Sequence, residues 1–258
     1  MVYIITKGNR KYSRVRAAPN RILEKAGLYI MQRFLTAIYQ KAEREAKEQY
    51  RVLNFLELLA FINLFVFYSV YNVNVGYGAD AQWQFSEAYA LWQKYTIWSL
   101  VVICGMTFTQ IGNVLLKGVT FLGIGLVVTL ASSVLLSEQT IYFGIFTFLG
   151  MAMLLVQAMH SWLKKSPGSC GWLLSAIAYD LTRHLTDGVI IWQGKVIGHV
   201  PQLLYTKAMT WLGFPAAGFS SMEYVPFLPN IFLFICGVYF FQFLTEHERG
   251  QEYLAKLR

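Results

Sequence analysis

The feature that most constrains the fold is an apolar stretch from Arg51 to Asn74, RVLNFLELLAFINLFVFYSVYNVN. A helix needs about 20 residues to cross a bilayer, and this stretch is long enough. At about 100° per residue, four of its polar side chains fall within an arc of roughly 60°, and a fifth points away. Polar groups in a bilayer must face protein or water, so this stretch is predicted to be a core helix carrying a site or the remains of one. The four on the arc are Asn54, Glu57, Tyr68 and Asn72, and the fifth is Asn63.

The composition is that of a membrane protein. Of the 258 residues, 56% are hydrophobic and 14% are charged, whereas soluble domains carry about 25% charged residues. We therefore predict an all-α fold, a multipass transmembrane helical bundle with one membrane domain. The net charge of +8 lies mainly in the N-terminal arm. In a membrane protein such charge indicates orientation and lipid contact, not nucleic-acid binding.

Three parts of the chain are distinguished by their composition. Residues 1–50 combine a basic arm with an amphipathic helix that is predicted to lie on the membrane or on a partner. The arm, residues 1–21, is basic and free of acids. It is typical of mitochondrial targeting segments and also of cytoplasmic basic tails, which leaves the mitochondrial inner membrane and the bacterial cytoplasmic membrane open. Residues 51–245 form the transmembrane domain, and 246–258 form a charged tail.

About six spans are predicted in the transmembrane domain. The fifth is weak, because only about nine apolar residues precede Asp180, so it either tilts or is re-entrant. An aromatic interfacial segment is expected at 76–93, and a loop with short interfacial helices at 186–222. With the N-terminus inside, the lysines between spans obey the positive-inside rule, with mild exceptions in the fifth loop. The predicted spans are 52–73, 95–110, 118–136, 141–163, 169–185 and 225–244.

Three segments, in order, resemble the heparan-alpha-glucosaminide N-acetyltransferase-like family. The segment 141–150, IYFGIFTFLG, is similar to the family's IYFGILHFIG, and 221–229, SMEYVPFLP, resembles its SxDYFPLLP. The first span resembles the family's IDFLRGIAIILMIIFHFLYDL helix, and a further element at 211–214 is similar. The resemblance covers about 50–245 and implies a membrane acyltransferase fold with acetyl-CoA as the acyl donor.

The chain departs from the family at its proton-transfer positions. Acyl transfer to an amine needs a base or a nucleophile, typically His. Asn and Tyr form hydrogen bonds, but neither is a ready base near neutral pH. We therefore predict no catalytic residue and no cofactor here, and interpret these positions as a hydrogen-bonded packing seam. This degenerate active face comprises Asn54 for Asp, Glu57 for Arg, Tyr68 for His, Asn72 for Asp, Thr147 for His and Glu223 for Asp.

A second candidate site is the ionisable cluster at the end of the fifth span. Asp180 and His184 have i,i+4 spacing, and His184 and Asp187 have i,i+3 spacing, so they can share one helix face. A carboxylate beside His is a general-base arrangement, and the alternative interpretation is a salt-bridged helix end. If the chain is active, His184 with Asp180 is the predicted catalytic pair, in a cavity that reaches the first span. Glu57 alone also fits proton relay or ion binding.

Metal and disulfide chemistry is not predicted. Cys104, Cys170 and Cys236 are odd in number and lack CxxC spacing, and neither HExxH nor paired-His spacing occurs.

The sequence thus favours a non-catalytic integral membrane protein. Its predicted role is an accessory or scaffold subunit of a larger membrane complex, with the lipid bilayer and other membrane subunits as partners. The alternative is a membrane-bound acetyl-CoA-dependent acyltransferase with a relocated catalytic group.

Overall fold

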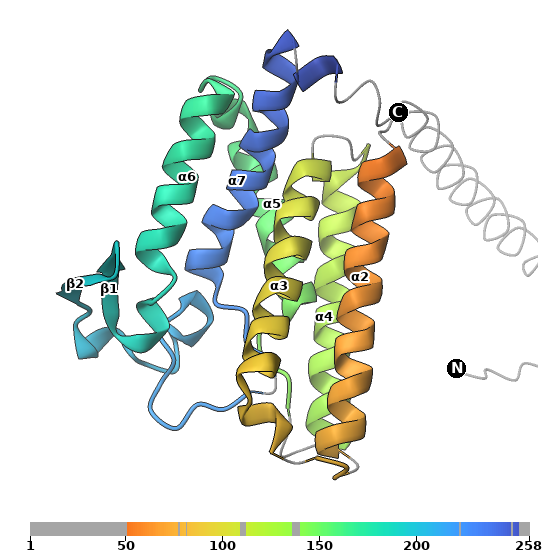
Figure 1. Cartoon of the computed structure of the whole chain (residues 1–258), viewed down its shortest axis with the longest axis vertical. Helices are drawn as coiled ribbons and strands as arrows, with labels where there is room; N and C mark the ends of the chain where they lie inside the picture. The colour runs from red at the N-terminus through yellow and green to blue at the C-terminus, as the bar shows by residue number, and fades with distance from the viewer. Residues whose placement is uncertain are drawn as a thin grey trace, which may run out of the picture. The chain divides into compact units, whose positions relative to one another are not determined.

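A computed structural model describes residues 51–76, 78–80, 82–108, 112–135, 140–221, 223–248 and 250–252. The basic arm, the amphipathic helix predicted within 1–50 and part of the predicted tail lie outside these residues. The described part contains six α-helices that pack side by side (Figure 1). The fold class is therefore all-α, as predicted. The helices are α2 (Arg51–Tyr71), α3 (Glu87–Thr107), α4 (Val114–Leu135), α5 (Ile145–Leu163), α6 (Gly168–Thr182) and α7 (Phe227–Glu246).

Four of these helices, α2, α4, α5 and α7, are long and apolar enough to cross a membrane. About six spans were predicted, and these four helices have the length and composition of a span. Helix α3 has 21 residues, but its first turns carry Glu87 and Lys94. Helix α6 has 15 residues and extends for about 22 Å at 1.5 Å per residue, less than the hydrocarbon thickness of about 30 Å. The fifth predicted span thus corresponds to a short helix, as its few apolar residues indicated.

Helix α3 begins eight residues before the predicted start of the second span at 95. Ser86 caps it, because its hydroxyl oxygen accepts a hydrogen bond from the backbone N–H of Tyr89 at 3.1 Å. Glu87 in the first turn adds a favourable interaction with the helix dipole. Of the aromatic residues expected at the interface, Tyr89 and Trp92 therefore lie on α3 and pack against Phe67 of α2, whereas Trp83 and Phe85 lie in a short 3-10 helix before it.

The segment predicted as a loop at 186–222 contains a β-hairpin. Strands β1 (Val189–Trp192) and β2 (Lys195–His199) pair antiparallel, with an irregularity after Ile190. Gln193 and Gly194 form the turn at φ values of 48° and 77°, the positive φ that a tight hairpin turn requires. The short 3-10 helices η7 (Gln202–Leu204) and η8 (Thr210–Leu212) lie where short helices were expected.

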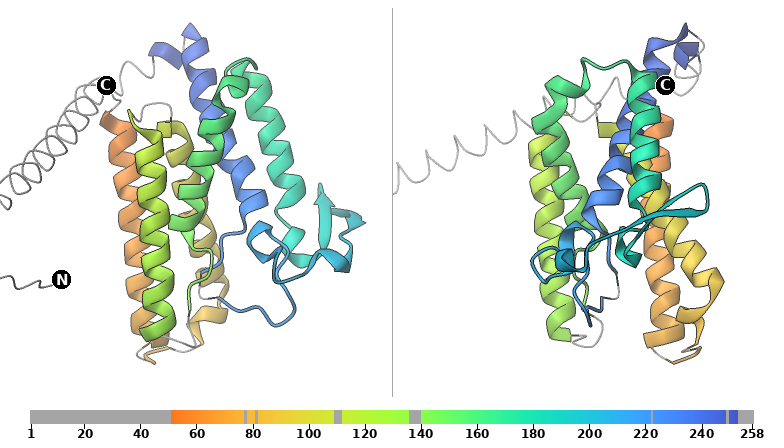
Figure 2. Two further views of the ribbon diagram at one scale, coloured as in Figure 1. Left: turned by 180° about the vertical axis from the view of Figure 1, so that it is seen from behind. Right: turned by 90° about the vertical axis from the view of Figure 1, so that its left-hand side faces the viewer.

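Glycines let two pairs of helices approach closely. A Cβ atom added to Gly105 of α3 would lie 3.2 Å from the Cα of Gly237 of α7, and the reverse distance is the same. Helix α4 packs beside α5 (Figure 2), where Gly150 faces the carbonyl oxygen of Gly118. Small residues at such crossings are typical of membrane helix packing. The core lies between α3, α5 and α7, and its fully buried side chains include Leu100, Val101, Leu149, Met153, Val156 and Phe234.

Candidate functional site

The polar stripe of α2 lies at the border of the helix's buried face, so one part of the stripe is buried and the other is exposed. That face contains Leu53, Leu64 and Tyr71. Glu57 lies on it, and Tyr68 lies half-buried at its edge. Asn54 and Asn72 lie about 100° around the helix from the buried Leu53 and Tyr71, and both are exposed.

Asn63, which was predicted to point away from the stripe, joins α2 to α3. Its side-chain nitrogen donates to the Thr96 hydroxyl at 2.7 Å, and its oxygen accepts from the Trp92 indole N–H at 3.1 Å. A side-chain amide carries both a donor and an acceptor, so one residue supplies both bonds. This inter-helix contact was missed because the helical period alone does not tell which neighbour a face meets.

Glu57 is buried at 9% exposure and ion-paired. Its Oε1 accepts from the Lys117 Nζ at 2.8 Å, and the Cys104 thiol donates to the same oxygen at 3.8 Å. The three residues belong to α2, α4 and α3. Lys117 was expected just before its span but lies within α4, which brings the ammonium to the carboxylate. A charge inside the membrane is stabilised by such a partner.

Glu223, just before α7, is buried at 3% exposure. Its Oε1 accepts a hydrogen bond from the backbone N–H of Ile145 at 3.1 Å, and its carboxylate also hydrogen-bonds Tyr68. Ile145 begins α5, whose N-cap residue Gly144 offers no side-chain cap, so Glu223 supplies the cap from a distant segment. Burial raises the pKa of Glu223 to about 6, against the opposing effect of the two hydrogen bonds.

Two positions of the degenerate active face are therefore in contact. The resemblance aligns Tyr68 with a His and Glu223 with an Asp, and here a phenol meets a carboxylate. Thr147 lies half-buried two residues after Ile145 and contacts Gly125 of α4. Glu223 thus joins three segments, because its carboxylate hydrogen-bonds both Tyr68 of α2 and the first residue of α5 from its own position before α7.

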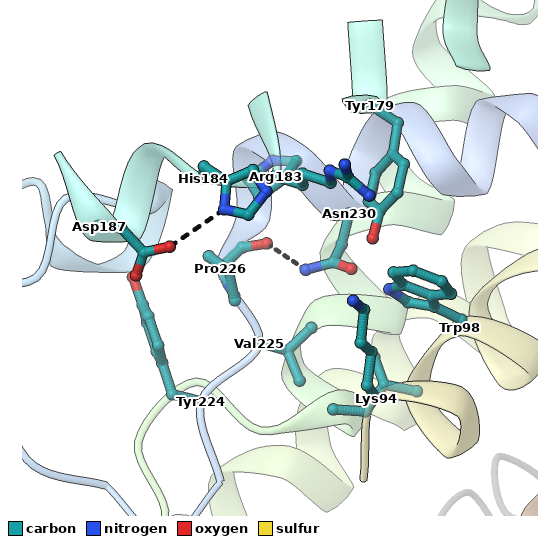
Figure 3. Close-up of a pocket in the computed structure, with 12 residues that line it drawn as sticks. Lys94, Trp98, Tyr179, Arg183, His184, Asp187, Tyr224, Val225, Pro226 and Asn230 are labelled. Atoms are coloured by element: carbon teal, nitrogen blue, oxygen red, sulfur yellow. Dashed lines mark hydrogen bonds and ion pairs between the residues drawn. The ribbon is translucent and has the colours of Figure 1, made fainter. Parts of the chain in front are cut away.

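A pocket of about 260 Å³ lies elsewhere, between α3, the end of α6 and the start of α7 (Figure 3). His184 lines it and pairs through Nδ1 with the Asp187 carboxylate at 3.2 Å. Asp180 pairs instead with Arg183 at 3.1 Å. Because α6 ends at Thr182, His184 lies beyond the helix and the i,i+4 geometry with Asp180 does not arise. The pocket is lined by Lys94, Ile97, Trp98, Tyr179, Arg183, His184, Asp187, Tyr224, Val225, Pro226, Pro229 and Asn230.

The lining residues come from α3 and from residues 179–230, whereas the predicted cavity was to reach the first span, α2. Lys94 and Trp98 were not identified as site residues, although their i,i+4 spacing on α3 places the Lys94 Nζ 4.5 Å from the centre of the Trp98 ring. Among the described residues, no group of three or more His, Cys, Asp or Glu side chains is arranged to hold a metal ion.

A comparison with known families agrees with this architecture. A family model described as "Heparan-alpha-glucosaminide N-acetyltransferase, catalytic" matches residues 50–257. Neither a curated protein nor a solved structure matches the chain. The matched range includes α2 to α7 and therefore both the Tyr68–Glu223 contact and the pocket.

Proposed function

Because the chain belongs to the heparan-alpha-glucosaminide N-acetyltransferase family, we propose that it is a non-catalytic member of it. In this proposal it is an integral membrane protein that serves as an accessory or scaffold subunit of a larger membrane complex. The observation that carries the proposal is the buried contact between Tyr68 and Glu223. The resemblance aligns these two positions with proton-transfer groups, and both are engaged here with other parts of the fold.

The chemistry of this contact supports the proposal. Acyl transfer from a thioester to an amine needs a base that can reach the amine. A Glu with a pKa of about 6 has a suitable basicity, but Glu223 is 3% exposed and accepts hydrogen bonds from Ile145 and Tyr68. Glu57 is similarly engaged, by Lys117. We infer that both carboxylates act as joints between helices.

The proposed membrane follows from the basic arm at 1–21. We propose the mitochondrial inner membrane or the bacterial cytoplasmic membrane, with other membrane subunits as partners. Subcellular fractionation of the source cells distinguishes the two membranes.

Two measurements on the full chain, purified in mild detergent, test the proposal. Incubation with labelled acetyl-CoA and an amine acceptor is expected to give neither transfer nor self-acetylation above background. Purification is expected to yield a stoichiometric set of other membrane subunits. Acetyl transfer that disappears in His184→Ala and persists in His199→Ala would refute the non-catalytic role, because His199 is an exposed hairpin residue outside the pocket lining. A lone monomer or homodimer would count against the scaffold role.

The second candidate is an acetyl-CoA-dependent acyltransferase with a relocated catalytic group. One observation favours it, namely the pairing of His184 with Asp187 at the edge of a pocket. A carboxylate that orients an imidazole supports general-base catalysis. In this alternative, His184→Ala abolishes acetyl transfer and Asp187→Asn reduces it, whereas Asp180→Asn leaves it close to wild type.

A further inference from the structure

The pocket beside α3 contains a lysine that has no acidic partner among the described residues. Lys94 extends over the Trp98 ring, with its Nζ 4.5 Å from the ring centre. Trp98 in turn meets Tyr179 of α6 edge to face, at 5.6 Å between ring centres and 86° between planes. In Figure 3 the Lys94 ammonium and the Tyr179 hydroxyl both point toward Asn230. The ammonium is thus held at the pocket by an aromatic wall, with its charge available to a ligand.

A second cation, Arg183, lines the same pocket. The Nη2 of Arg183 pairs with Asp180 at 3.1 Å, and 34% of the Arg183 side chain is still exposed where it lines the pocket. A guanidinium carries five N–H donors, and a single carboxylate does not occupy all of them. An acceptor group in the ligand therefore suits Arg183 as well as Lys94.

The start of α7 contributes to the same side of the pocket. Its N-cap residue, Pro226, makes no side-chain cap, and Pro226, Pro229 and Asn230 line the pocket. Asn230 donates from its Nδ2 to the Pro226 carbonyl oxygen at 2.8 Å. The N-terminus of a helix carries partial positive charge and favours anions. Three elements, α3, α6 and α7, thus present positive charge or donors to one volume.

The acidic groups near the pocket have partners. Asp187 lies at the edge with 64% of its side chain exposed and pairs with His184. Asp180 pairs with Arg183. The negative charge is therefore occupied or solvated, whereas the Lys94 charge is free to meet an anion.

We propose that this pocket binds the phosphate group of a phosphate ester, either the phosphodiester of a phospholipid headgroup or a soluble phosphomonoester. Lys94 and the exposed part of the Arg183 guanidinium contact phosphate oxygens, and the N-terminus of α7 adds its dipole. A tetrahedral phosphate accepts hydrogen bonds from several directions, which suits donors on three elements. The Trp98 and Tyr179 rings pack against the ester's carbon atoms, and about 260 Å³ admits a headgroup-sized molecule.

Binding by the full chain in detergent tests this site. The probes are phosphatidylglycerol and, as the matched lipid without phosphate, diacylglycerol with the same acyl chains. Native mass spectrometry is expected to show retained phosphatidylglycerol and little diacylglycerol. Competition with sn-glycerol 3-phosphate distinguishes the two kinds of ligand. Displacement of bound phosphatidylglycerol indicates a site for a soluble phosphomonoester, and retention of phosphatidylglycerol indicates a site for the lipid headgroup.

Variants locate the binding. Lys94→Met is expected to weaken phosphatidylglycerol binding by about 10- to 100-fold, the range for a hydrogen bond to a charged group, and Lys94→Arg restores most of it. Lys165→Met, an exposed lysine after α5, serves as the control and is expected to bind like the wild type. Equal retention of diacylglycerol and phosphatidylglycerol by the wild type overturns the proposal without any variant. Equal binding of phosphatidylglycerol by Lys94→Met and Lys165→Met also overturns it. The same holds if neither phosphatidylglycerol nor sn-glycerol 3-phosphate binds to the wild type.

Discussion

Replacing Glu223 with Gln tests whether this buried carboxyl controls how stability depends on pH. In the folded chain the pKa of Glu223 is raised from 4.5 to about 6 by burial. The folded state therefore holds the proton more tightly than the unfolded state. Stability from this group is greatest below about pH 4.5 and falls as the pH rises through 6, because the ionised form is desolvated.

The size of the effect follows from the two pKa values. Each pH unit corresponds to about 1.4 kcal/mol, so a pKa raised from 4.5 to about 6 amounts to about 2 kcal/mol. Gln is nearly isosteric and neutral at every pH, and its carbonyl oxygen still accepts from the Ile145 N–H. The unfolding free energy of Glu223→Gln, measured relative to the wild type, should therefore rise by about 2 kcal/mol between pH 4 and pH 7.5.

Unfolding by SDS in mixed micelles, followed by tryptophan fluorescence at both pH values, measures this change. Comparing differences between pH values removes any constant effect of the altered contact with Tyr68. Glu248→Gln, at an exposed position in the tail, controls for loss of a carboxyl and should track the wild type. An unchanged difference between Glu223→Gln and the wild type across the two pH values would refute the reasoning.

Three further substitutions test the contacts between helices by SDS unfolding. Asn63→Leu removes both hydrogen bonds to α3 and should lower the unfolding free energy by about 1 kcal/mol, at about 0.6 kcal/mol per membrane hydrogen bond; no loss would mean that these bonds are not formed in the membrane. Gly105→Leu should cost about 1–3 kcal/mol by overpacking the crossing with α7, whereas Gly123→Leu, whose added Cβ has no atom of the described residues within 4 Å, should cost little; equal costs would contradict the crossing. Lys117→Met should cost about 3 kcal/mol by leaving a buried carboxylate unpaired, and adding Glu57→Gln should recover most of it; an undiminished loss in the double variant would contradict the ion pair.

The extent of each helix could be predicted where hydropathy carries the information. Helix α5 was expected at 141–163 and occupies Ile145–Leu163, and α7 was expected at 225–244 and occupies Phe227–Glu246. Helix α3 was placed too late because Glu87, Gln93 and Lys94 interrupt its first turns, although Ser86 followed by Glu87 is the cap signal that marks its start. The hairpin at 189–199 was missed because Gln193-Gly194 is a weak turn signal in a segment treated as a loop.

The candidate sites were less predictable because they depend on contacts between distant segments. The helical period placed Glu57 and Tyr68 on one side of α2, but it did not indicate that Lys117 and Glu223 would meet them. For His184, sequence spacing allowed two carboxylate partners, and the end of α6 at Thr182 selects Asp187.

The polarity of position 223 has a structural cause that does not depend on catalysis. Helix α5 begins at Ile145 after a glycine that supplies no side-chain cap, so the first backbone N–H groups need an acceptor from elsewhere. The Glu223 carboxylate provides it, and the Tyr68 hydroxyl hydrogen-bonds the same carboxylate. An apolar residue at 223 would leave both groups buried without this partner, at about 1–3 kcal/mol each. This chain therefore requires an acceptor at 223 whether or not it carries out acyl transfer, and the donor at 68 complements it.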